Sequence, residues 1–69
     1  MKRITVTEVG PDIRTKRFEV FGNVVKDVLG WLEFSADLNE FVFKPSDYRL
    51  GIHSLEEIRS SILEKNKLL

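Results

Sequence analysis

Hydrophobic and polar residues alternate with a period of two over most of the first 44 positions, which is the pattern of half-buried β-strands. Residues typical of turns separate the alternating segments, most clearly at Gly10-Pro11-Asp12. Pro45 cannot donate to a strand ladder and should end the last strand. The segment 24–27 could be a loop or a twisted extension of the third strand. The predicted strands cover about residues 3–9, 17–21, 28–34 and 40–44.

The pattern then changes to that of one amphipathic helix. Ser54 and Glu57 have the spacing of a capping box, in which the Ser hydroxyl accepts from the backbone N–H three residues on and the Glu carboxylate reaches back to the Ser N–H. An apolar stripe at helical spacing follows, at Leu55, Ile58 and Ile62. We therefore expect a helix over about residues 55–66 that begins at Leu55, with Ser54 as its N-cap.

These elements predict an α+β fold: a four-stranded antiparallel β-meander with one C-terminal helix packed on one face, in a single domain over residues 1–69. Because side chains alternate across a strand, one side of the sheet should form the core with the helix. That core side is predicted to carry Phe18, Val20, Leu32, Phe34, Phe41 and Phe43, with Tyr48 and Leu50 closing one edge.

One helix cannot cover both sides of the sheet, so the other side should stay open. Trp31 is the main candidate there, because exposed aromatic side chains next to charges mark protein interfaces. In the alternative, the protein itself covers Trp31 with the segment 22–28 or with Leu68 and Leu69. The predicted partner-binding residues are Trp31, Phe21, Leu29, Val42, Arg17 and Glu33.

Composition narrows the class of protein. With 42% hydrophobic and 10% aromatic residues, the 69-residue chain can build one core. Eleven basic and eleven acidic residues give zero net charge, which argues against strong nucleic-acid binding. The absence of Cys excludes disulfides, zinc–thiolate sites and thiol catalysis. The polar start and the lack of a long apolar run predict a cytoplasmic protein without a signal peptide or a membrane span.

No residue pattern points to catalysis. His53 is the only His and should brace the start of the helix. The Asp residues fall in predicted turns, where their side chains bond the local backbone, and the glycines do not form a phosphate loop. Gly30 lies within a strand and marks a bulge or a close approach by the helix. We therefore expect no enzyme activity, no cofactor and no metal site.

Three runs carry a resemblance: residues 29–34 (Leu-Gly-Trp-Leu-Glu-Phe), 40–45 (Glu-Phe-Val-Phe-Lys-Pro) and 54–58 (Ser-Leu-Glu-Glu-Ile). Over about residues 17–66 the chain resembles a group of short phage and prophage proteins of unknown function. These proteins have a Leu-Gly strand, a strand that ends in aromatic-x-Pro, and a helix that begins with Leu and Glu-Ile. The resemblance implies an origin in a mobile element and a role exerted by binding. Small phage proteins often inhibit or modulate host enzymes, including defence systems.

The expected function is therefore that of a small non-enzymatic protein-binding module, which binds and modulates or inhibits a host protein through its open sheet face. The partner would be a host or phage protein, or a second copy of the chain, in the cytoplasm of the host cell. The alternative is a nucleic-acid-binding β-sheet module that contacts phosphates mainly through the first hairpin. Its candidate phosphate contacts are Arg14, Lys16, Arg17, Lys26 and Lys44.

Overall fold

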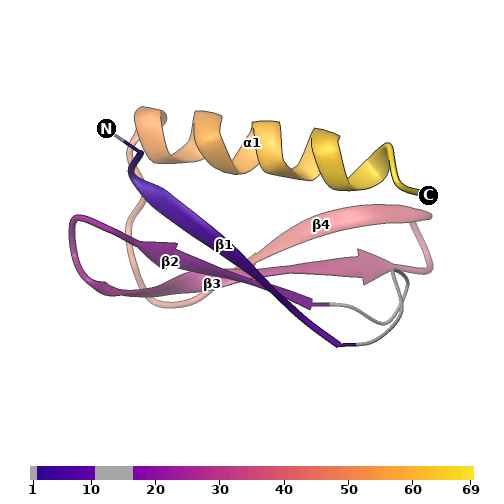
Figure 1. Cartoon of the computed structure of the whole chain (residues 1–69), viewed down its shortest axis with the longest axis horizontal. Helices are drawn as coiled ribbons and strands as arrows, with labels where there is room; N and C mark the ends of the chain where they lie inside the picture. The colour runs from indigo at the N-terminus through magenta and orange to yellow at the C-terminus, as the bar shows by residue number, and fades with distance from the viewer. Residues whose placement is uncertain (1, 11–16) are drawn as a thin grey trace.

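The computed structural model describes residues 2–10 and 17–69 of the chain. Four strands form one antiparallel sheet in chain order, and one helix lies across one side of it (Figure 1). The predicted ββββα arrangement is thus confirmed. Of the candidate residues named above, Pro11, Asp12, Arg14 and Lys16 lie outside the described residues. The elements are β1 (Ile4–Val9), β2 (Arg17–Gly22), β3 (Asp27–Ser35), β4 (Glu40–Pro45) and α1 (Ile52–Asn66).

Four-residue turns join the last three strands, over residues 23–26 and 36–39. Each turn ends in a residue with positive φ, at Lys26 (60°) and Asn39 (56°), which reverses the chain within a short connection. The Oδ1 atom of Asp27 accepts a hydrogen bond from the Val28 amide at 2.8 Å. Of the segment 24–27, which the sequence left open, residues 24–26 therefore lie in a turn and Asp27 begins β3.

The predicted core side of the sheet is confirmed. Phe18, Val20, Leu32 and Phe41 are all at most 3% exposed, and Phe34 and Phe43 are partly buried against them. The Phe41 ring packs edge to face against both Phe18 and Phe34, with centroid distances of 5.7 and 5.8 Å. Period-two alternation assigned these side chains correctly because their strands are regular at these positions.

The position of Leu29 differs from the predicted one. The register pairs Val20 with Gly30 and Phe21 with Val28, so that Leu29 is the extra residue of a β-bulge. The bulge shifts the alternation by one residue and turns Leu29 into the core, where it is 4% exposed. The prediction that Leu29 lies on the open side was therefore wrong.

The bulge requires a glycine at position 30, because neighbouring atoms leave no space for a side chain there. A Cβ atom there would overlap the Lys44 carbonyl oxygen and lie 2.8 Å from the Phe43 ring, and the φ of Gly30 is 156°. The bulge expected near Gly30 is confirmed. The close approach comes from β4, however, and not from the helix.

The predicted start of the helix was also wrong. Helix α1 begins at Ile52, with Gly51 as its N-cap, and no side chain among the described residues makes a capping hydrogen bond. The Glu57 carboxylate instead accepts from the backbone amides of Arg3 at 3.0 Å and Ile4 at 3.3 Å. Leu55, expected in the core, is 43% exposed, because the core-facing stripe of α1 consists of Ile58 and Ile62.

Helix α1 contacts both edge strands of the sheet, β1 and β4. In the first half of α1 the Glu57 carboxylate accepts from the amide of Ile4, the first residue of β1, and at the end of α1 the Asn66 Oδ1 atom accepts from the Phe41 amide of β4 at 2.7 Å. The Lys65 ammonium group also lies 4.8 Å from the centroid of the Phe18 ring. Polar side chains of one helix thus pair backbone N–H groups at both edges, which fixes α1 across the core side, so that the helix does not cover the opposite side of the sheet.

The segment between β4 and α1 packs at one end of the core. Leu50 is partly buried against the core, whereas Tyr48 remains 38% exposed. The Tyr48 hydroxyl donates to the Asp27 Oδ2 atom at 2.6 Å. This hydrogen bond, followed by that from the Val28 amide, lowers the pKa of the Asp27 carboxyl, and it raises the pKa of Tyr48. The contact ties the segment after β4 to the start of β3.

Candidate functional site

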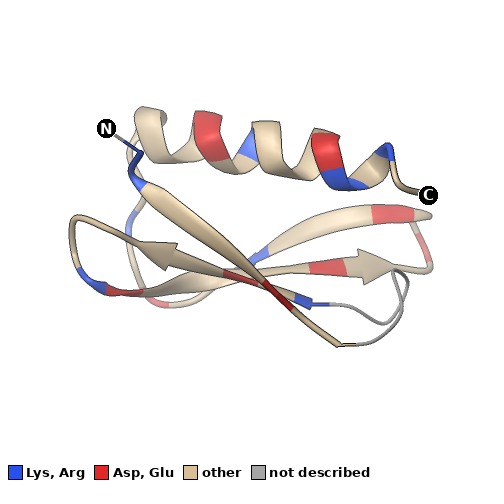
Figure 2. Ribbon diagram, viewed as in Figure 1, with Lys and Arg blue, Asp and Glu red and all other residues tan. Residues whose placement is uncertain are grey.

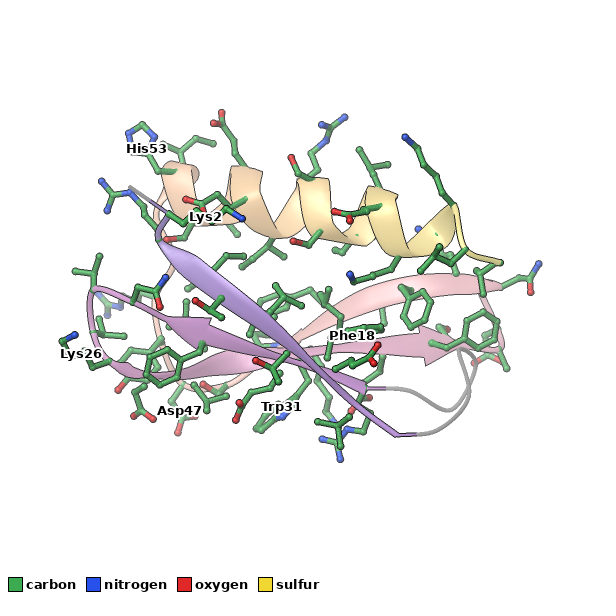
Figure 3. All side chains as sticks on the ribbon, viewed as in Figure 1. Lys2, Phe18, Lys26, Trp31, Asp47 and His53 are labelled. Atoms are coloured by element: carbon green, nitrogen blue, oxygen red, sulfur yellow. The ribbon has the colours of Figure 1, made fainter. Side chains whose placement is uncertain are left out.

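The side of the sheet that points away from α1 is the candidate site, and it is called the open face below. Figure 3 shows Trp31 projecting from this side. The strand register places Trp31 between Glu19 of β2 and Lys44 of β4. The open face consists of Thr5, Thr7, Val9, Arg17, Glu19, Phe21, Val28, Trp31, Glu33, Ser35, Glu40, Val42 and Lys44.

Trp31 lies in the middle of this face and is partly buried. The Arg17 guanidinium carbon lies 5.5 Å from the Trp31 ring centroid, which is the geometry of a cation–π contact. Arg17 also pairs with Glu33, opposite it in the ladder, through a 3.1 Å Nε–Oε1 contact. Among the described residues, Arg17 of the same face therefore lies over Trp31.

The ion pair between Arg17 and Glu33 orients the Arg17 side chain but adds little to the stability of the fold. Their side chains are 54% and 30% exposed, and ion pairs in such positions contribute little because water screens them. A planar guanidinium that is held by a carboxylate and lies on an indole nevertheless has a defined position. The face thus presents an ordered Trp–Arg–Glu cluster, defined here as Trp31, Arg17 and Glu33.

Apolar side chains flank this cluster on two sides. Phe21 and Val28 are paired across β2 and β3, and Val42 lies opposite Glu33 on β4; all three are partly buried. Five of the six predicted partner-binding residues therefore share the open face, while Leu29 does not. Val28 takes the place that the sequence assigned to Leu29. The feature of the sequence that could have indicated this exchange is Gly30, because a glycine within a strand can mark a bulge.

Charges of both signs are mixed over the molecule. In Figure 2, Lys and Arg positions alternate with Asp and Glu positions along α1 and across the strands. Among the candidate phosphate contacts that the structure describes, Arg17 is paired with Glu33, Lys26 is in the β2–β3 turn, and Lys44 is in β4 beside Trp31. These three cations are spread over different strands and turns and do not form one basic patch.

An open groove of about 740 Å³ runs between β1 and α1. It combines cations, carboxylates and an imidazole, but the Glu57 carboxylate in it is engaged by backbone amides. His53 lies inside the first turn of α1 and is exposed, not before the helix as the sequence suggested (Figure 3). The lining includes Lys2, Arg3, His53, Glu56, Glu57 and Lys65.

Within residues 2–10 and 17–69, no three His, Cys, Asp or Glu side chains are grouped so that they could hold a metal ion. In the same part of the chain, no helix is both long and apolar enough to cross a membrane. Comparisons with models of protein families, with characterised proteins and with solved structures give no significant match for this chain. The function has to be argued from the geometry of the open face.

Proposed function

We propose that this protein is a small non-enzymatic binding module that docks on another protein through its open face. The observation that carries the proposal is the position of Trp31, the only Trp of the chain, in the middle of a sheet surface that points away from α1. Trp and Arg contribute more to binding energy at protein interfaces than other residue types. Here the two are in contact, and apolar side chains flank them.

The arrangement of the open face supports a partner that is itself mixed in polarity. The flat rings of Trp31 and Phe21 offer apolar area, and they are already partly ordered by the sheet, which reduces the entropy lost on binding. Arg17 and Glu33 add one charge of each sign and suit a partner with polar groups at the rim of its contact surface. No cofactor is needed for such a role.

The proposed partner is a host or phage protein, which the module modulates or inhibits in the cytoplasm of the host cell. The resemblance to short phage and prophage proteins supports this class of partner, and a defence system is one such target. The zero net charge supports a protein partner over a nucleic acid, because little counterion release would drive binding to phosphates.

Capture of partners from a host lysate, followed by titration of the purified partner, tests the proposal. Trp31→Ala should weaken binding by about 2 kcal/mol, or roughly thirtyfold in dissociation constant, because truncation removes a central anchor of the interface. The variant should keep most of its stability, since the Trp31 side chain lies outside the core cluster. Leu38→Ala, at an exposed apolar residue of the β3–β4 turn, is the matched control and should bind like the wild type.

Two results would contradict the proposal. In one, Trp31→Ala unfolds the domain while its folded fraction keeps every interaction, so that Trp31 acts as a core residue. In the other, fluorescence anisotropy finds sub-micromolar binding to DNA or RNA with a steep dependence on salt, which is the behaviour expected of the nucleic-acid alternative.

A further inference from the structure

The outer side of α1 carries an exposed apolar stripe that packing of the helix on the sheet does not use. Ile52, Leu55 and Leu63 are 63%, 43% and 47% exposed, respectively. Ile52 and Leu63 lie on the side of α1 that points away from the core-facing Ile58 and Ile62, whereas Leu55, three and seven residues before these two, lies at the edge of the core-facing side. Single exposed apolar residues are common on proteins, so Ile52 and Leu63 alone do not define a contact surface.

Two charges interrupt this stripe, and they make it complementary to itself. Glu56 and Arg59 are exposed and lie between Ile52 and Leu63 on the same side of the helix. Ile52 and Leu63 are equally far from one point in the middle of α1, and Glu56 and Arg59 are equally far from that same point. A twofold axis through this point would place Ile52 beside Leu63 of a second copy and Glu56 beside Arg59 of that copy.

We propose that the outer side of α1 binds a second copy of this chain as an antiparallel helix pair. Two apolar contacts at the ends and two opposite-charge contacts in the middle would form at once, as expected of an isologous interface. The charge complementarity favours a second copy over an unrelated partner, because in this arrangement each charged residue of one copy faces its opposite on the other copy.

The length of α1 sets the strength of this association. Fifteen residues span about 22 Å, so that the contact is shorter than a standard protein interface of about 800 Å² per partner. We therefore expect a weak dimer that exchanges quickly with the monomer. The outer side of α1 and the open face lie on opposite sides of the molecule, and hence this inference does not depend on the proposed function (Figures 1 and 3).

Charge reversal gives a specific test by sedimentation equilibrium over a range of concentrations. The wild type should shift from the 8.0 kDa monomer toward about twice that mass as its concentration rises. Glu56→Arg places two Arg pairs in the dimer and Arg59→Glu places two Glu pairs in it, so each variant alone should dimerise roughly five- to thirtyfold more weakly. A mixture of the two variants should recover dimerisation, because every contact then joins opposite charges, and the double variant should recover it as well.

Apolar variants test the same surface without relying on charge. Leu63→Glu should abolish dimerisation while circular dichroism shows an intact fold, because Leu63 is exposed on α1. Leu38→Glu is the control at an exposed Leu of the β3–β4 turn and should dimerise like the wild type.

Three outcomes would overturn the inference. The wild type could remain at 8.0 kDa at all concentrations, or the mixture of charge-reversed variants could dimerise no better than either variant alone. Self-association could also be lost in Trp31→Ala and kept in Leu63→Glu. That last result would place the homodimer on the open face.

Discussion

Replacing Leu29 by Ala should destabilise the domain by about 3 kcal/mol. Leu29 is 4% exposed, and its side chain lies against Gly22, where an added Cβ would be only 2.9 Å from the Leu29 Cγ atom. The substitution removes the equivalent of about three buried CH2 groups at roughly 0.8 kcal/mol each, and the cavity that remains adds to the cost. A domain of this size has a total stability of about 3–10 kcal/mol, so the loss would be a large part of it.

Urea denaturation and thermal unfolding followed by circular dichroism measure this change. A loss of about 3 kcal/mol corresponds to a decrease in Tm of roughly 12–24 °C for a domain of this length. Val28→Ala is the matched control, because Val28 is the neighbouring residue of β3 and lies on the open face, partly exposed. It should cost less than about 1 kcal/mol, since only part of the side chain is removed from water.

The comparison of these two variants decides whether the bulge exists. A regular strand would place Leu29 on the open face, in line with Trp31, and would place Val28 in the core. If Val28→Ala costs more than Leu29→Ala, then the register of β2 and β3 described above is wrong. A destabilised Leu29→Ala variant that still binds a partner at saturating concentration would support the assignment of Leu29 to the core.

Ser54→Ala should change the free energy of unfolding by less than about 0.5 kcal/mol, whereas Glu57→Ala should cost about 1–2 kcal/mol, because of these two side chains it is Glu57 that accepts hydrogen bonds from backbone amides. Chemical denaturation compares the two variants. Gly30→Ala should cost about 2–3 kcal/mol or prevent folding, because its Cβ would overlap the β4 backbone, and the same measurement would reveal a harmless substitution. Tyr48→Phe should move the pKa of Asp27 up toward the usual 3.8, as followed by NMR titration. Because the folded-state pKa of Asp27 is depressed, the stabilisation by this contact is present above pH 3.8 and is lost as the pH falls through the folded-state pKa.

Local patterns in the sequence were sufficient for the elements and for most of the core. Alternation between polar and apolar residues marked all four strands, and an apolar spacing of four residues marked the helix through Ile58 and Ile62. The core positions of Phe18 and Phe41 also followed from alternation. These features depend on burial of one side of each element, and the chain records that burial residue by residue.

The candidate site could be predicted in large part for the same reason. Trp31, Phe21 and Val42 alternate with core residues in regular stretches of their strands, and parity therefore placed them on the open face. The contact of Arg17 with Trp31 was not predictable, because it depends on the register between β2 and β3, which alternation within one strand does not define.

The remaining features were decided by contacts between distant parts of the chain. Ser54 and Glu57 have the spacing of a capping box, but 54 positions separate Glu57 from the Arg3 amide that it binds, and that contact exists only once α1 packs beside β1. Leu29 is in the core because β4 approaches Gly30 closely and the strand takes up one extra residue there. A local pattern specifies which residue types suit a helix or a strand, whereas the geometry of packing determines which of several suitable partners each side chain reaches.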